Sequence, residues 1–133
     1  GLVAGVIERA GAELRRLGGA PVTTLIGPCI GPSAYEFGPA DLAAASGVFG
    51  PEVRSHTAWG TPALDVPRAV AVACERAGWP APTDAPPCTS DERWFSHRTR
   101  ADQGRQTTVA WLERDRPGPP SRIGAGRSCP PSP

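Results

Sequence analysis

The sequence predicts an α/β fold in which packed helices cover a mixed sheet. Several segments repeat apolar residues with the period of a helix, and two short runs, residues 22–26 and 106–112, are rich in β-branched residues. The expected order is helix, strand, helix, helix, strand, strand, which fits a layered α/β architecture. Because only a few strands are expected, the sheet should be incomplete.

The first two expected elements are an amphipathic helix and a buried strand. Apolar residues recur at helical spacing over residues 2–17, and the Gly18-Gly19 pair ends the helix. Residues 22–26 follow as a β-branched run bounded by proline and glycine, which is typical of a buried strand.

The middle of the chain predicts two more helices. A short helix is expected over residues 40–45, and residues 47–63 show no clear period and are expected to form a loop. Asp65 is a suitable N-cap for a helix over residues 67–77, and Gly78 should end that helix. Cys74 would be a small core residue on its apolar side.

The C-terminal third predicts two strands and a tail. Strands are expected over residues 94–97 and 106–112, after a stiff proline-rich connector. Residues 114–133 are mostly Pro, Gly, Arg and Ser, so they cannot bury enough apolar surface to offset their ordering entropy. This tail is expected to be disordered.

Composition limits the possible partners. The net charge is only +1, with 14 arginines nearly balanced by 13 Asp and Glu residues, so the chain lacks the basic excess of a nucleic-acid binder. No apolar stretch is long enough to span a bilayer, which predicts a soluble protein without a membrane partner. The four cysteines form no Cys-x-x-Cys pair, which excludes a zinc ribbon.

The segment IGPCIGPSAYEFG, residues 26–38, carries the strongest local signal for a functional site. Cys29 lies between two Gly-Pro pairs directly after an expected strand, so its backbone is restricted. Such a cysteine can act as a nucleophile or ligand if neighbouring groups lower its pKa. It can equally be a small residue in a tight structural turn, and the residues alone leave both interpretations open.

A second segment, residues 88–106, combines a thiol, an imidazole, aromatic rings and several arginines. Arginine suits phosphate or carboxylate recognition because its planar guanidinium donates paired hydrogen bonds. The alternative is a polar hairpin, and for Arg100 and Arg105 individually we favour solvated side chains. A lone histidine such as His97 is more often structural than catalytic.

Three segments, in order, resemble one protein family. They are GLVAGVIERAGAEL from Gly1, IGPCIGPSAYEFG from Ile26, and CTSDERWFSHRTR from Cys88. Together they are similar to the C-terminal part of laccase-domain proteins, also described as polyphenol oxidases and peptidoglycan editing factors. The resemblance covers residues 1–113 and implies an incomplete, C-terminal portion of that α/β fold.

This resemblance implies a fragment of a cytoplasmic, metal-dependent purine nucleoside phosphorylase with adenosine deaminase activity. Its substrates would be a purine nucleoside and phosphate, and its metal would be zinc or copper. The family's His, Cys and His ligands precede the segment that matches Gly1, so the catalytic residues are expected upstream and no metal is expected in this chain alone. Cys29, Tyr35 and Arg98 are then the candidate walls of the substrate pocket.

Two alternatives remain beside the phosphorylase. The same fold would serve a hydrolase that edits peptidoglycan precursors, and a chain without the metal ligands could be a non-catalytic remnant. Ser33, Ala34 and Thr99 depart from the family's usual residues, which leaves the chemistry of the pocket open.

Overall fold

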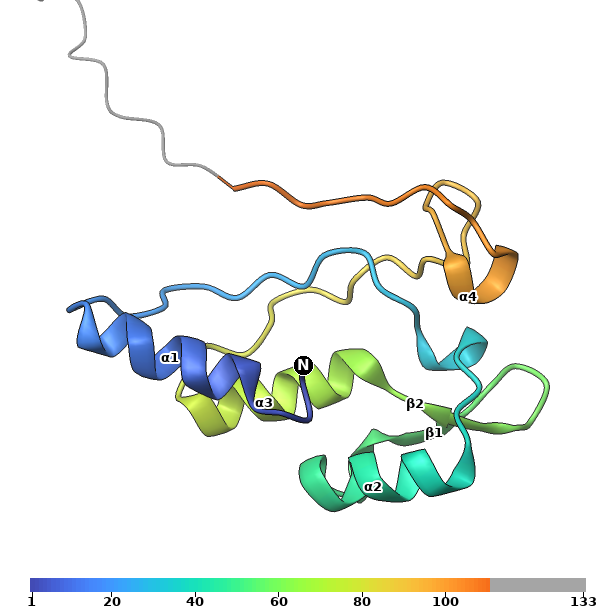
Figure 1. Ribbon diagram of the computed structural model, residues 1–133, viewed down its shortest axis with the longest axis horizontal. Coiled ribbons are helices and arrows are strands. Elements are labelled where there is room, and N and C mark those ends of the chain that lie inside the picture. Colours follow the sequence, from blue (N-terminus) through green and yellow to red (C-terminus); the bar gives the residue numbers. More distant parts are fainter. Residues whose placement is uncertain (111–133) are drawn as a thin grey trace, which may run out of the picture.

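The computed structural model describes residues 1–110, which form a helical body with α1 to α3 and a C-terminal arm, residues 88–110 (Figure 1). The regular elements of this part are the helices α1 (Val6–Arg16), α2 (Pro39–Phe49), α3 (Val66–Ala77) and α4 (His97–Arg100), the 3-10 helices η1 (Pro32–Ala34) and η2 (Pro51–Val53), and the strands β1 (Arg54–His56) and β2 (Pro62–Leu64). Residues 114–133, which we expected to form a disordered tail, lie outside the described residues.

Helix α3 is the centre of the hydrophobic core. Its Ala69, Val72 and Ala73 pack with Phe49, the last residue of α2, and with Val53 of η2. All five side chains are at least 95% buried. Partly buried apolar residues from α1, β2 and the N-terminus, Ile7, Leu64 and Leu2, complete this core.

Both ends of α3 follow the prediction. The carboxylate of Asp65 accepts a hydrogen bond of 2.9 Å from the backbone N–H of Arg68, which otherwise has no partner in the first turn. Gly78 adopts φ 72°, a left-handed conformation that glycine takes without steric cost, and ends the helix. Cys74 is buried, as expected for a small core residue.

Helix α1 packs beside α3 through Gly11 as well as through Ile7 (Figure 1). Gly11 is the one buried residue of α1, and a Cβ there would lie 2.6 Å from Nε1 of Trp79. Arg15, one turn further along α1, donates a 3.0 Å hydrogen bond to the carbonyl oxygen of Ala77. The helices therefore approach closely where α1 carries no side chain.

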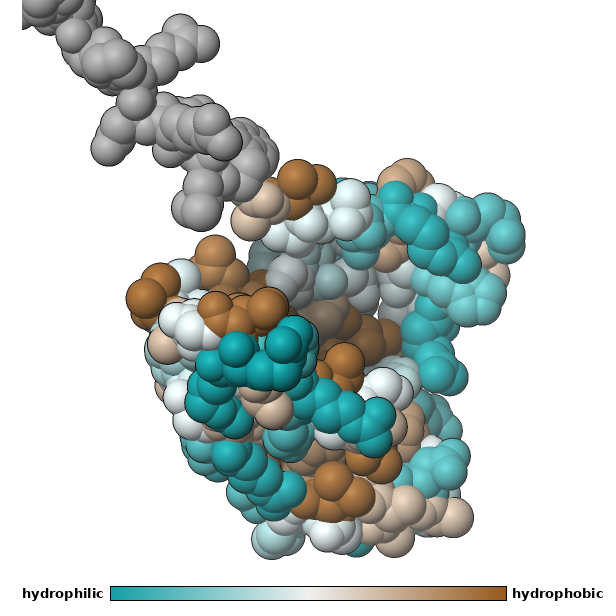
Figure 2. Space-filling model, turned by 60° about the vertical axis from the view of Figure 1, so that its left-hand side comes forward, coloured by the Kyte–Doolittle hydropathy of each residue, from teal (hydrophilic) through white to brown (hydrophobic). Residues whose placement is uncertain are grey.

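Part of the apolar stripe of α1 remains exposed. Val3 and Val6 are more than half exposed, and Leu14 is 36% exposed. Figure 2 shows hydrophobic surface on this side of the molecule, next to the charged residues of α1. Apolar side chains at and near the start of α1 therefore remain exposed among the described residues.

The sheet is smaller than predicted and lies elsewhere in the sequence. Residues 47–63, expected to be a loop, contain the end of α2, η2 and an antiparallel hairpin in which Ser55 pairs with Ala63. The expectation of a structureless loop was wrong because three-residue strands are too short to show a periodic pattern. Within residues 1–110 this two-stranded sheet is the only one, so these residues combine helices and strands but form no mixed sheet.

Three predicted strands are not strands in the structure. Residues 22–26 are extended without a ladder partner among the described residues, and Val22 is 90% exposed rather than buried. Residues 94–97 form a turn and the start of α4, because Ser96 caps that helix. Residues 106–110 are irregular and exposed, and the remainder of that predicted strand lies outside the described residues.

No helix among residues 1–110 is both long and apolar enough to cross a bilayer.

The contact between α1 and Trp79 predicts an unusual response to alanine. Replacing a helical glycine by alanine ordinarily stabilises a helix by about 0.5–1 kcal/mol. Gly47→Ala in α2 should follow this rule, because no atom lies within 4 Å of the added Cβ. Gly11→Ala should instead lower the free energy of unfolding, because the new methyl displaces Trp79. Urea denaturation followed by circular dichroism measures both; equal stabilisation by the two substitutions would contradict this packing.

Candidate functional site

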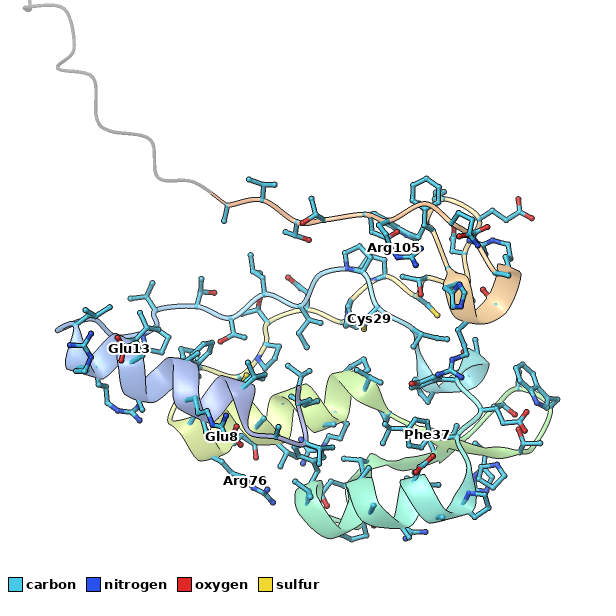
Figure 3. The ribbon with its side chains drawn as sticks, in the orientation of Figure 1. Glu8, Glu13, Cys29, Phe37, Arg76 and Arg105 are labelled. Carbon is cyan, nitrogen blue, oxygen red and sulfur yellow. The ribbon has the colours of Figure 1, made fainter. Side chains whose placement is uncertain are left out.

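Two loops that are distant in sequence meet at Cys29 and Cys88. The N–H of Cys29 donates to the carbonyl oxygen of Pro87 at 3.1 Å, and the N–H of Thr89 donates to the carbonyl oxygen of Cys29 at 3.0 Å. These bonds form an isolated parallel bridge with the two cysteines as partners. The extended segment containing Cys29 therefore lies between the helical body and the arm (Figure 3).

A short capped turn places Arg98 beside this bridge. The Ser96 hydroxyl accepts a hydrogen bond from the N–H of Thr99 and begins α4, and the N–H of Ser96 donates to Oδ2 of Asp102 at 2.8 Å. Arg100 also donates to Oδ2 of Asp102 and to the backbone carbonyls of Ser90 and Trp94. Arg100 is thus a structural residue, as expected in preference to anion recognition, although its guanidinium is bound within the loop rather than solvated alone.

The structure brings Cys29, Tyr35 and Arg98 to the same hollow. The guanidinium of Arg98 lies over the Tyr35 ring, 4.9 Å from its centroid, and one nitrogen donates to the Tyr35 hydroxyl at 3.4 Å. Such stacking restrains a long arginine side chain. A hollow of about 330 Å³ opens here, and its walls also include His97 and Phe95.

A second, larger hollow also has Arg98 in its wall. It has a volume of about 810 Å³ and is lined by Arg98, Ser90, Glu36 and Trp59, together with small residues of η1. The indole N–H of Trp59 donates to the Glu36 carboxylate at 3.3 Å, although the Trp59 side chain is 60% exposed. Arg98 therefore lines two hollows, one bordered by an exposed tryptophan and the other by a thiol.

Among the arginines of residues 88–106, Arg98 and Arg105 form no ion pair with a described carboxylate, and of these two it is Arg98 that lines both hollows. Arg93 binds Asp91, and this side-chain hydrogen bond lowers the pKa of Asp91 to about 2. Arg100 pairs with Asp102 at 3.1 Å. No carboxylate within residues 1–110 lies within ion-pair distance of Arg98. Its positive charge is therefore available to an anion.

The two cysteines of the bridge have different acidities. Burial raises the pKa of Cys29, and the nearby Cys88 and Asp65 raise it further. Partial burial would also raise the pKa of Cys88. However, hydrogen bonds from the Ser90 hydroxyl and from the backbone N–H groups of Ser90 and Gly31 outweigh that effect and lower the pKa. A nucleophilic cysteine needs neighbours that lower its pKa. The surroundings of Cys29 raise its pKa, whereas those of Cys88 lower it.

The described residues do not assemble a metal site. No group of three or more His, Cys, Asp or Glu side chains within residues 1–110 is placed to hold one ion. Zinc and copper sites in proteins ordinarily need at least three such ligands. These residues therefore do not fit a zinc or copper centre by themselves.

Comparison with known proteins shows the family. The family described as multi-copper polyphenol oxidoreductase laccase matches residues 1–113, and the chain belongs to it. A Streptomyces coelicolor protein named purine nucleoside phosphorylase is 34% identical over 116 residues, covering 85% of this chain and 48% of that protein. A Mycobacterium bovis protein of the same name is 33% identical over 112 residues, covering 82% of this chain and 44% of the relative. No solved structure matches the chain.

The chain spans about half the length of the curated relatives that it matches. The family resemblance inferred from the three sequence segments is thus confirmed over the expected range, residues 1–113.

Sequence reasoning missed two residues of this region. The sequence analysis gave Cys88 no role of its own within residues 88–106. The hydrogen bond that its sulfur accepts comes from Gly31, 57 positions away, and no local pattern indicates it. Trp59 was placed in a loop without a role, yet it borders the larger hollow. The Cys-Thr-Ser start of the segment was the available signal for Cys88, because Ser90 two residues later is the hydroxyl that contacts its sulfur.

The Asp102 contacts predict a local change in dynamics. Asp102→Ala removes the acceptor shared by the Ser96 N–H and Arg100, so residues 94–102 should exchange amide hydrogens roughly tenfold faster or more. Helix α3 should keep its protection because it shares no contact with Asp102. Hydrogen exchange with mass spectrometry measures both regions, and Asp84→Ala, in the exposed connector, is the matched control. Unchanged exchange in residues 94–102 would show that Asp102 does not hold the arm.

Proposed function

We propose that this chain supplies the phosphate-binding wall of a purine nucleoside phosphorylase. The observation that carries the proposal is Arg98, a cation without an acidic partner in the described residues, held over Tyr35 in the wall of two hollows. The names of the relatives support phosphorolysis as the reaction.

In phosphorolysis, phosphate attacks the sugar carbon that bears the base, and the base leaves. A planar guanidinium can donate two parallel hydrogen bonds to phosphate and balance its charge. Tyr35 would orient this group by stacking, and its hydroxyl accepts one of the guanidinium hydrogens at 3.4 Å. Trp59, 60% exposed at the rim of the larger hollow, presents a ring on which a purine can stack.

We further propose that the whole protein depends on zinc or copper and deaminates adenosine at the same pocket. The family name supports metal use. Residues 1–110 do not fit the metal by themselves, so its ligands would come from other parts of the whole protein. Cys29 forms part of the wall of the smaller hollow rather than holding an ion.

The test is a kinetic assay of the protein encoded by the complete reading frame that contains this chain. We expect phosphate-dependent release of base from adenosine or inosine. Arg98→Ala should raise the KM for phosphate roughly 10- to 100-fold, because a hydrogen bond to a charged group contributes about 1.5–3 kcal/mol. The KM for the nucleoside should change little. Arg98→Lys should recover part of the loss, since it keeps the charge without the planar fork.

Arg9→Ala provides the matched control, because it removes one exposed arginine from α1, away from both hollows. An equal effect of Arg9→Ala and Arg98→Ala on phosphate KM would overturn the assignment of Arg98. Ammonia release from adenosine without phosphate measures the deaminase activity separately. Absence of both activities in the complete protein would favour a non-catalytic remnant.

A further inference from the structure

Cys29 and Cys88 are the partner residues of the parallel bridge that joins the two loops. In a parallel bridge the partner residues project from the same face, and their Cα atoms are about 4.8 Å apart. Disulfides form between residues whose Cα atoms are about 4.4–6.8 Å apart. Both cysteines are free thiols in the structure and both are partly exposed.

The sulfur of Cys88 is held by a set of hydrogen bonds. The N–H of Gly31 donates to it at 3.1 Å, and the Ser90 hydroxyl lies 3.0 Å away. Gly31 has no side chain, and a Cβ there would lie 3.4 Å from this sulfur. Donors directed at a sulfur stabilise its thiolate, which is the form that reacts with peroxides.

We propose that Cys88 and Cys29 are a peroxide-sensitive thiol pair that closes to an intramolecular disulfide. The Cys88 thiolate attacks one oxygen of hydrogen peroxide, the O–O bond breaks, and the hydroxide that leaves takes a proton to form water. Cys88 is then a sulfenic acid. The Cys29 thiol attacks that sulfur, the S–O bond breaks, and a second water leaves with the Cys29 proton. Two thiols lose two electrons, and one peroxide becomes two waters.

The roles of the two thiols follow from their surroundings. The pKa of Cys88 is lowered by its donors, whereas burial raises the pKa of Cys29, so Cys88 is the attacking thiol and Cys29 the resolving one. Cys74 is an internal reference: it is 1% exposed, and burial raises its pKa. It should stay reduced while the chain is folded.

Closure of this disulfide would alter the neighbouring hollow. Cys29 lines that hollow together with Tyr35 and Arg98, so a bond to Cys88 draws one wall toward the adjacent loop. The Cys88 sulfur would also lose its thiolate character, which weakens the hydrogen bond from Gly31. The inference rests on the bridge geometry and the acidity of the two thiols, and it does not depend on the proposed phosphorylase activity.

The test uses the 133-residue chain treated with one equivalent of hydrogen peroxide. Cys129, the fourth cysteine of the sequence, is changed by Cys129→Ser so that only Cys29, Cys74 and Cys88 can react. We expect a monomer that has lost two hydrogens. Its tryptic map should join the peptide that ends at Arg54, which contains Cys29, to the peptide that ends at Arg93, which contains Cys88. Iodoacetamide at neutral pH should label Cys88 roughly tenfold faster or more than Cys29.

Two variants separate the roles of the thiols. In Cys29→Ser the sulfenic acid at Cys88 should persist and be trapped by dimedone, whereas in Cys88→Ser oxidation of Cys29 should slow at least roughly tenfold. Protection of Cys74 from iodoacetamide shows that each variant is folded. The proposal is overturned if the folded chain forms no Cys29–Cys88 peptide, or if Cys88 reacts no faster than it does in guanidinium.

Discussion

The hydrogen bonds that join residues 29–31 to residues 87–89 are the contact on which the candidate site depends. Three backbone N–H groups take part, those of Cys29, Thr89 and Gly31, and the last donates to a sulfur. No described helix or sheet connects the arm to the body at this point. These bonds hold the segment that carries Arg98 next to the segment that carries Tyr35, and both hollows are lined by residues of these two segments.

The arginines of the arm differ in whether an aspartate neutralises them. Arg93 and Arg100 are each paired with an aspartate two residues away, so they shape the loop rather than bind ligands. Arg98 lies between them in sequence but projects toward the body, where an aromatic ring takes the place of a carboxylate. Aromatic stacking restrains the side chain without neutralising its charge, which suits recognition of an anion.

The sequence predicted the helices well and the strands poorly. Residues 67–77 carry their own start and stop signals, Asp65 and Gly78, and these local signals act as expected. Residues 22–26 have strand composition, but a strand also needs a partner, and no described segment pairs with them. For the site, the motifs identified Cys29, Tyr35 and Arg98, which do meet. Cys88 could not be assigned a role, because the donors to its sulfur come partly from a loop far away in sequence.

Gly31 and Cys88 are 57 positions apart in the sequence, so the hydrogen bond between them closes a long loop. Closing so long a loop costs chain entropy, and here few contacts offset that cost. The contacts of α3 with its neighbours, by contrast, bury apolar side chains almost completely. The arm is therefore the unit that detaches first in a sub-global fluctuation, while the helical body stays folded. Ligand access and thiol exposure at this site would then share one opening equilibrium.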